Sequence, residues 1–231
     1  MERRMEDFMI FGAAANNVNK EFTNQGNVNA TYSVELSEKI NMNLSSGYHA
    51  EKWELTTVLL PQGFFGLTED FLGGPYLISY GYDFNLDLNY KLLDNNTLLI
   101  GATYMNEGLL DVENQMTHNP ITLEFQGELM PIDGFSFNEE KERNVFGAYI
   151  QDQHKIGDYL KITAGARFDN YDDFGSSFNP RVALVYNTPI KSVVKAMYGT
   201  AFRAPNFLEL YDKTILLILA SQISTLKRLT P

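Results

Sequence analysis

The feature that most constrains this chain is an alternation of apolar and polar side chains at every second position. It is clearest in residues 27–36, where Val28, Ala30, Tyr32 and Val34 alternate with asparagine, threonine, serine and glutamate. Successive side chains of an extended chain point to opposite faces. Each such segment therefore predicts a β-strand with one apolar face and one polar face.

The alternation recurs in about eight segments that are joined in pairs as hairpins. The segments are 27–36 and 39–49, 82–92 and 98–104, 145–155 and 160–168, and 181–186 and 194–202. Short turns near Ser37, Asn95, Gly157 and Thr188 join each pair, whereas the connections 50–79, 106–144 and 170–179 are long.

Strands of about ten residues are long enough to cross a bilayer when tilted. Short turns at one end and long loops at the other are typical of outer-membrane barrels. We therefore expect an all-β fold, an antiparallel partial transmembrane β-barrel with short periplasmic turns and long extracellular loops. Because its edge strands have no partners, it should form an open, curved sheet, and such edges invite aggregation.

Aromatic residues on the apolar faces fall into two bands. The band at the long-loop end contains Tyr48, Tyr82, Tyr104, Phe168 and Phe202, and the band at the short-turn end contains Tyr90, Tyr159 and Tyr186. Aromatic girdles of this kind mark the two membrane interfaces. The alternative is that aromatic residues simply favour strands.

The opposite face is too polar to be the core of a protein. Its members include Asn29, Thr31, Asn41, Asn43, Asp83, Asn85, Asp87, Asn89 and Lys91. Burying all of these side chains would carry a large desolvation cost. The polar face therefore predicts a wet or plugged lumen in a wide barrel.

Composition and motifs exclude several classes of function. The net charge of -11 argues against a nucleic-acid partner, because phosphate binding needs a basic face. The absence of cysteine rules out disulfides, thiolate catalysis and cysteine zinc sites. Neither GxSxG, a Walker loop nor HExxH occurs, so we expect no enzyme activity and no cofactor. The first residues lack the apolar stretch of a signal peptide, and residues 1–26 are expected to be an irregular start.

Three histidines are candidates for a metal site. His49, His118 and His154 lie far apart in the sequence, so solvated or lumen-facing histidines are favoured over a shared metal ion. We assign no catalytic, cofactor-binding or metal-binding residue.

Two other groups lie in the expected outer loops. Asp169, Asp172 and Asp173 could bind a cation such as calcium, but a solvated acidic loop is favoured. Loop aromatics could grip a ligand above the pore, because loops carry specificity, or they could pack against one another. These aromatics are Trp53, Phe64, Phe65, Phe71 and Tyr76. The ligand-binding residues are not identified by the sequence.

Three further motifs occur in order near the end of the chain. They are GAYIQD at 147–152 followed by LKITAGARFD at 160–169, FNPRVA at 178–183, and FRAPNFLELY at 202–211. Together they resemble motifs of the TonB-dependent outer-membrane receptors, barrels that import siderophores, cobalamin, haem or glycans. The resemblance is strong over residues 144–213 and only topological over 27–143.

The resemblance implies a barrel of about 22 strands with an N-terminal plug that carries a TonB box. Neither the plug nor the box is recognisable in this sequence, so we expect residues 27–213 to be an internal barrel fragment that does not transport alone. The implied partners are outer-membrane lipid and an unidentified small-molecule ligand, with TonB only in a full-length relative. The implied location is the outer membrane. Arg203, Pro205, Glu209 and Tyr211 match the motif, but no ligand role is assigned to them.

Residues 214–231, TILLILASQISTLKRLTP, depart from the family pattern. They are apolar without alternation, and we expect a short helix there. Permitted codons read from the third base of each can instead encode NNPANLGKPNLNPETINT from Lys213 onward, which resembles the family's continuation. We interpret the tail as out of frame after a frameshift near Lys213, and the nucleotide sequence of the gene tests this interpretation.

Two other functions remain as alternatives. A self-contained outer-membrane porin or adhesin would need a lumen filled by side chains, and the short polar residues argue against that. Its test is single-channel conductance. A soluble all-β binding domain would pack its apolar faces together as a sandwich, and it would refold without detergent.

Overall fold

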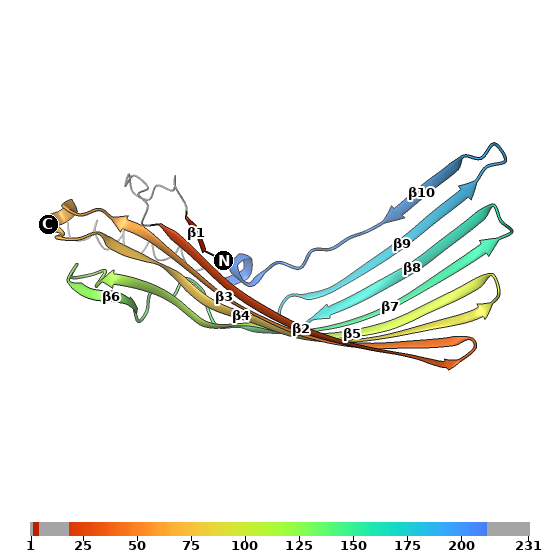
Figure 1. Ribbon diagram of the computed structural model, residues 1–231, viewed down its shortest axis with the longest axis horizontal. Coiled ribbons are helices and arrows are strands. Elements are labelled where there is room, and N and C mark those ends of the chain that lie inside the picture. The colour runs from red at the N-terminus through yellow and green to blue at the C-terminus, as the bar shows by residue number, and fades with distance from the viewer. Residues whose placement is uncertain (1, 5–18, 212–231) are drawn as a thin grey trace.

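The computed structural model describes residues 2–4 and 19–211, which form one curved antiparallel sheet (Figure 1). The strands that follow one another across the sheet are β2 (Lys20–Ser37), β3 (Ile40–Leu60), β4 (Phe71–Leu93), β5 (Asn96–His118), β7 (Glu142–Ile156), β8 (Leu160–Tyr171), β9 (Gly175–Asn187) and β10 (Val193–Gly199). The short elements are β1 (Glu2–Arg4), β6 (Phe125–Pro131), the 3-10 helix η1 (Phe64–Gly66) and the helix α1 (Phe207–Tyr211).

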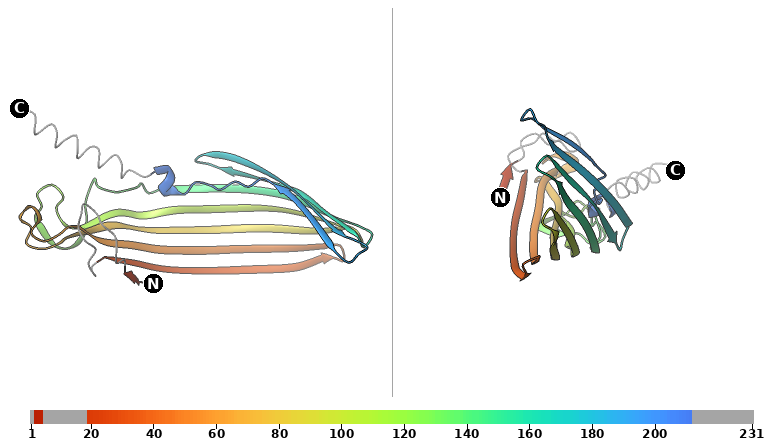
Figure 2. Two further views of the ribbon diagram at one scale, coloured as in Figure 1. Left: turned by 90° about the horizontal axis from the view of Figure 1, so that it is seen from above. Right: turned by 90° about the vertical axis from the view of Figure 1, so that its right-hand side faces the viewer.

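The strands lie in sequence order across the sheet, except that β6 pairs with the outer end of β5. The short turns lie together at one end of the molecule (Figure 2). Within residues 2–4 and 19–211, β10 pairs only with β9 and the other edge ends at β1, so the sheet does not close into a barrel. The predicted all-β, antiparallel, open and curved sheet is confirmed.

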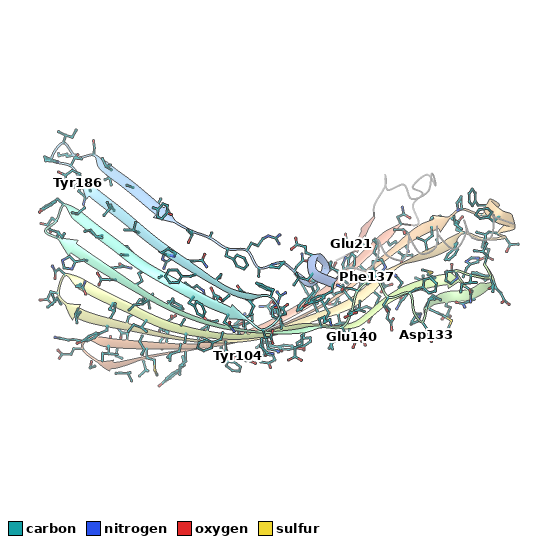
Figure 3. The ribbon with its side chains drawn as sticks, turned by 180° about the vertical axis from the view of Figure 1, so that it is seen from behind. Glu21, Tyr104, Asp133, Phe137, Glu140 and Tyr186 are labelled. Atoms are coloured by element: carbon teal, nitrogen blue, oxygen red, sulfur yellow. The ribbon has the colours of Figure 1, made fainter. Side chains whose placement is uncertain are left out.

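The register places the apolar residues of neighbouring strands on one face. Tyr48 on β3 lies opposite Tyr82 on β4, and Tyr104 on β5 lies opposite Phe84 and Phe146. This face is the convex side of the sheet, where Figure 3 labels Tyr104. The polar residues predicted for a lumen alternate with these residues and therefore lie on the concave side.

The strands are longer than the alternation predicted, and the three long loops are correspondingly shorter. β4 has 23 residues, so at about 3.3 Å per residue it extends about 76 Å, more than twice the roughly 30 Å of a bilayer core. Most of the predicted loop 50–79 lies in β3 and β4, and β5 and β6 occupy much of 106–144. The predicted loop 170–179 is a turn at 172–174. The alternation fades in these outer segments because a strand with water on both sides does not need an apolar face.

A β-bulge interrupts the pairing of β4 with β5. The register shifts between Tyr76 and Ile78, and Asp111 on the facing strand has a left-handed φ of 48°. A bulge changes which face the following side chains occupy. Next to it lies the buried apolar cluster, which consists of Leu77, Leu109, Val112, Phe137 and Phe207.

Two predictions concern the ends of the chain. β2 begins at Lys20, earlier than the predicted strand start at Asn27. The short helix predicted within residues 214–231 lies outside the described residues, as does most of the predicted irregular start.

Candidate functional site

A hydrogen-bonded polar network lies on the concave face, across β4, β7 and β8. The Tyr149 hydroxyl donates to the Asp87 carboxylate, and Arg167 Nε donates to both carboxylate oxygens of Asp169 at 2.9 Å. The Arg167 guanidinium also lies 5.5 Å from the centre of the Tyr149 ring, a cation–π distance. The network therefore presents both charge signs to the concave side, as a water-filled lumen requires.

Glycines provide the space for these large polar side chains. A Cβ atom built on Gly101 would overlap the Tyr149 ring. One built on Gly147 would lie 2.6 Å from Asp169 Oδ1 and 2.8 Å from Arg167 Nη2. Packing therefore requires glycine at both positions, because any larger residue would displace part of the network.

A polar crevice of about 310 Å³ opens beside the network. Tyr149, Arg167, Asn179, Arg181 and Thr200 line it, and Arg181 Nη2 donates to Gln151 Oε1 at 2.5 Å. Guanidinium groups that face one crevice can bind carboxylate or phosphate oxygens with paired N–H donors. The two arginines make the crevice suited to an anionic group.

Residues 200–211, here called the strap, cross the concave side after β10 and end in α1 (Figure 1). The side-chain oxygen of Asn206 accepts from Glu209 N at 2.8 Å, and Glu209 Oε2 accepts from Asn206 N at 3.0 Å. This reciprocal pair is a capping box that starts the helix. Arg203 donates to both carboxylate oxygens of Glu209, which holds the pKa of Glu209 below its ordinary value. The polar residues of the FRAPNFLELY motif therefore shape the strap itself.

Arg143 fastens the strap to the sheet. Its side chain is 2% exposed, and Nε donates to the two carboxylate oxygens of Asp173 at 2.9 and 2.8 Å. Nη1 donates to Glu107 Oε1 and to the carbonyl oxygen of Pro205, both at 3.1 Å. One guanidinium thus joins β5, β7, the turn after β8 and the strap. The sequence contains no signal for this contact.

Aromatic rings enclose the same guanidinium. Its carbon lies 4.8 Å from the centre of the Phe174 ring and 4.7 Å from that of Phe207. The carbonyl of Phe207 accepts from Asn138 Nδ2 at 3.2 Å, and Phe137 packs in the same cluster beside α1 (Figure 3). Burial between two rings excludes water from the ion pair and strengthens it.

The predicted candidate residues separate in the structure. His49, His118 and His154 lie on β3, β5 and β7. His118 is 1% exposed; its ring stacks on Phe71 and is tilted against Phe125, with ring centres 5.0 Å from each. In the part of the chain that the structure describes, no group of three or more histidines and carboxylates is placed to hold a metal ion.

The favoured interpretation of the acidic residues as a solvated loop is wrong for Asp169 and Asp173, whereas Asp172 is exposed in the turn 172–174. Asp169 is 6% exposed and pairs with Arg167, and the Asp173 side chain, 10% exposed, pairs with Arg143. The third carboxylate, Asp172, accepts from the backbone and side-chain nitrogens of Asn144. Each acid thus has its own partner from another position of the sheet.

The aromatic residues assigned to loops lie mostly in strands. Trp53 is on β3, and Phe71 and Tyr76 are on β4, so only Phe64 and Phe65 remain in a loop, in η1. Trp53 Nε1 donates to Glu21 Oε1 at 3.0 Å, which joins β2 to β3.

The predicted outer aromatic band lies on the convex face, with one exception. Tyr48 is 51% exposed, and the rings of Tyr82 and Tyr104 lie 6.3 Å apart. Phe202 instead lies in the strap, and its ring centre is 6.1 Å from that of Tyr171 on β8. Three further exposed aromatic residues, which were not assigned to the band from the sequence, extend it: Phe84, Phe146 and Phe178.

None of the helices in residues 2–4 and 19–211 has the length and apolarity needed to span a membrane.

The chain is similar to two curated proteins of Vibrio cholerae. It is 34% identical to the iron-regulated outer membrane virulence protein over 64 residues, 28% of this chain and 10% of that protein. It is 41% identical to the vitamin B12 transporter BtuB over 51 residues, 22% of this chain and 8% of the transporter.

A solved structure has the same fold. The ferric enterobactin receptor PfeA of Pseudomonas aeruginosa, in a mutant form, superimposes with a TM-score of 0.57 at 17% sequence identity. The superposition covers 84% of this chain and 27% of the receptor. A family described as "TonB dependent receptor-like, beta-barrel" matches residues 9–226, nearly the whole chain. The chain therefore belongs to the TonB-dependent receptor β-barrel family.

Proposed function

We propose that this chain forms part of the wall of an outer-membrane receptor that takes up a scarce nutrient, such as siderophore-bound iron, cobalamin, haem or a glycan. One observation carries the proposal: the sheet has an apolar convex face with an aromatic band and a polar concave face. A barrel wall between lipid and a wet lumen needs that division. The names of the two Vibrio cholerae relatives, one iron-regulated and one a vitamin B12 transporter, support a nutrient of this kind.

The described strands also bear on transport. Residues 19–211 form an open sheet that encloses no lumen. We infer that this chain does not carry out energised uptake alone and needs further strands to complete a pore. Uptake of labelled ferric siderophore or cobalamin by cells that express only this chain, and none of their own receptors, would contradict the inference.

The division between lipid and water can be tested with cysteine chemistry, because the chain has no cysteine of its own. Ala183 and Leu184 are neighbours on β9 that point to the concave and convex faces. In lipid nanodiscs, Ala183→Cys should react with a charged, water-soluble thiosulfonate. Leu184→Cys should react with a lipid-soluble maleimide and resist the charged reagent. Equal reaction of the two variants with the charged reagent would refute membrane insertion in this orientation.

A further inference from the structure

A polar cluster interrupts the apolar convex face near the short-turn end of the sheet. It consists of Asn96 on β5 with Asp152 and His154 on β7. Asn96 lies directly opposite His154, and Asp152 lies between Leu98 and Ala164 on the neighbouring strands. The cluster therefore shares the face that the rest of these strands fills with apolar side chains.

The aromatic residues nearby indicate the depth of the cluster. Tyr90, a member of the short-turn band, pairs with Leu98, which pairs in turn with Asp152. Tyrosines of such bands sit at the level of the lipid headgroups. In a membrane the cluster would lie where hydrocarbon meets headgroups, within reach of both.

The hydrogen bonds determine what the cluster offers to a ligand. Asn96 Nδ2 donates to Asp152 Oδ1 at 2.6 Å and lies 3.1 Å from His154 Nδ1. An amide nitrogen can only donate, so Nδ1 is the acceptor and the neutral imidazole carries its proton on Nε2. His154 therefore has an N–H donor on Nε2 that this hydrogen bond does not use, and the second carboxylate oxygen of Asp152 is left as an acceptor.

Two oxygen atoms of the cluster, one on Asp152 and one on Asn96, face no donor or cation in residues 19–211. None of the ion pairs in residues 19–211 involves Asp152. Asn96 is 7% exposed, and its Oδ1 atom has no hydrogen-bond partner in the same part of the chain. An ionised side chain on a lipid-facing surface is costly without a partner and by default indicates a functional site. The negative potential of the two oxygens favours a cation from the membrane side.

We propose that Asn96, Asp152 and His154 bind the headgroup of a phospholipid that carries a primary ammonium, such as phosphatidylethanolamine. The ammonium N–H groups donate to the free oxygen of Asp152, beside the unpartnered oxygen of Asn96. The phosphate of the same headgroup accepts from His154 Nε2. A quaternary ammonium has no N–H to donate, so phosphatidylcholine fits less well. This site rests on the proposed membrane insertion of the chain.

Competition between lipids tests the proposal. The full chain is inserted into nanodiscs of equal parts phosphatidylethanolamine, phosphatidylcholine and phosphatidylglycerol. The protein is then released from the nanodisc, and native mass spectrometry identifies and quantifies the lipids that remain bound to it. We expect retained phosphatidylethanolamine to exceed phosphatidylcholine by roughly tenfold, the scale of one charge-assisted hydrogen bond. Asp152→Asn, which keeps the shape of the side chain, should abolish the preference. Asp158→Asn makes the same chemical change at an exposed turn and should keep the preference.

The possible outcomes are distinct. Equal retention of the ethanolamine and choline lipids by the unaltered chain overturns the site, even if Asp152→Asn fails to fold. A preference for phosphatidylglycerol overturns it as well, because that lipid has a phosphate but no ammonium. A chain that enters the nanodisc without headgroup preference refutes the site and leaves membrane insertion intact. A chain that does not enter the nanodisc overturns both.

Discussion

Replacing Arg143 with methionine should release the strap from the sheet. The Arg143 side chain is 2% exposed, and its loss leaves the Asp173 carboxylate, whose side chain is 10% exposed, without a cation. Removing one partner of a buried ion pair costs about 3–5 kcal/mol. Glu107 adds less to the loss because its side chain is 29% exposed and can be hydrated instead.

Two further variants separate charge from packing. Arg143→Met combined with Asp173→Leu should recover most of the lost stability, because replacing both members of a buried pair with apolar residues is often neutral. Arg143→Lys keeps the positive charge but loses the two-pronged bond to Asp173 and the flat contact with Phe174 and Phe207. Its effect should lie between those of the other two variants.

Hydrogen–deuterium exchange of the amides in α1 measures the docking of the strap directly. A destabilisation of about 3 kcal/mol or more should accelerate their exchange by roughly a hundredfold or more, up to the rate of the undocked strap. Arg203→Met is the matched control, because it removes an arginine of the same strap whose side chain is 74% exposed. Its effect should be much smaller, as for other exposed ion pairs.

Two results would refute this reasoning. If Arg143→Met and Arg203→Met accelerate exchange equally, burial of the Arg143 contacts does not decide the docking of the strap. If the double variant exchanges as fast as Arg143→Met alone, the unpaired Asp173 is not the source of the loss.

Two more predictions concern the wall and the strap. Gly101→Ala should lower the urea midpoint of unfolding, because its methyl group would overlap the Tyr149 ring. Gly26→Ala is the control and should leave the midpoint unchanged, because no atom lies within 4 Å of its Cβ position. Equal midpoints for the two variants would show that the Tyr149 ring can move aside. Acid should loosen α1. The hydrogen bond from Arg203 holds the pKa of Glu209 below its ordinary value of 4.5. The ionised Glu209 carboxylate therefore stabilises α1 fully above pH 4.5, and this stabilisation is lost as the pH falls through the lowered pKa. An NMR titration of the α1 amides should show this transition in the unaltered chain and not in Glu209→Gln, and a transition that persists in the variant would assign it to another group.

The membrane-crossing part of each strand could be predicted from the sequence, but the outer extensions of β2 to β5 could not. Between lipid and lumen, each residue has one permitted side, so apolar and polar residues must alternate. Beyond that zone the strands β2 to β5 continue with water on both faces, and a bulge at Asp111 interrupts the pairing of β4 with β5. Alternation is not required there, and the bulge interrupts what remains of it. The same segments therefore resemble loops in the sequence.

The fastening of the strap could not be predicted because its partners are distant in the chain. Arg143 bonds to Asp173, 30 residues later, to Glu107, 36 residues earlier, and to Pro205, 62 residues later. Each of these residues alone resembles an ordinary charged or turn residue of a surface loop. No local spacing indicates that they meet.

The sequence by itself determined the class of fold, the two unlike faces of the sheet and the family. These properties follow from residues two positions apart and from short motifs, and both are local. Only the tertiary structure decided which carboxylates are buried and paired, that the FRAPNFLELY segment lies across the concave side, and that Asp152 lies on the convex face with a hydrogen bond from Asn96 but with no cationic partner among residues 19–211. Those properties depend on strand register, which brings residues together through backbone pairing over long separations.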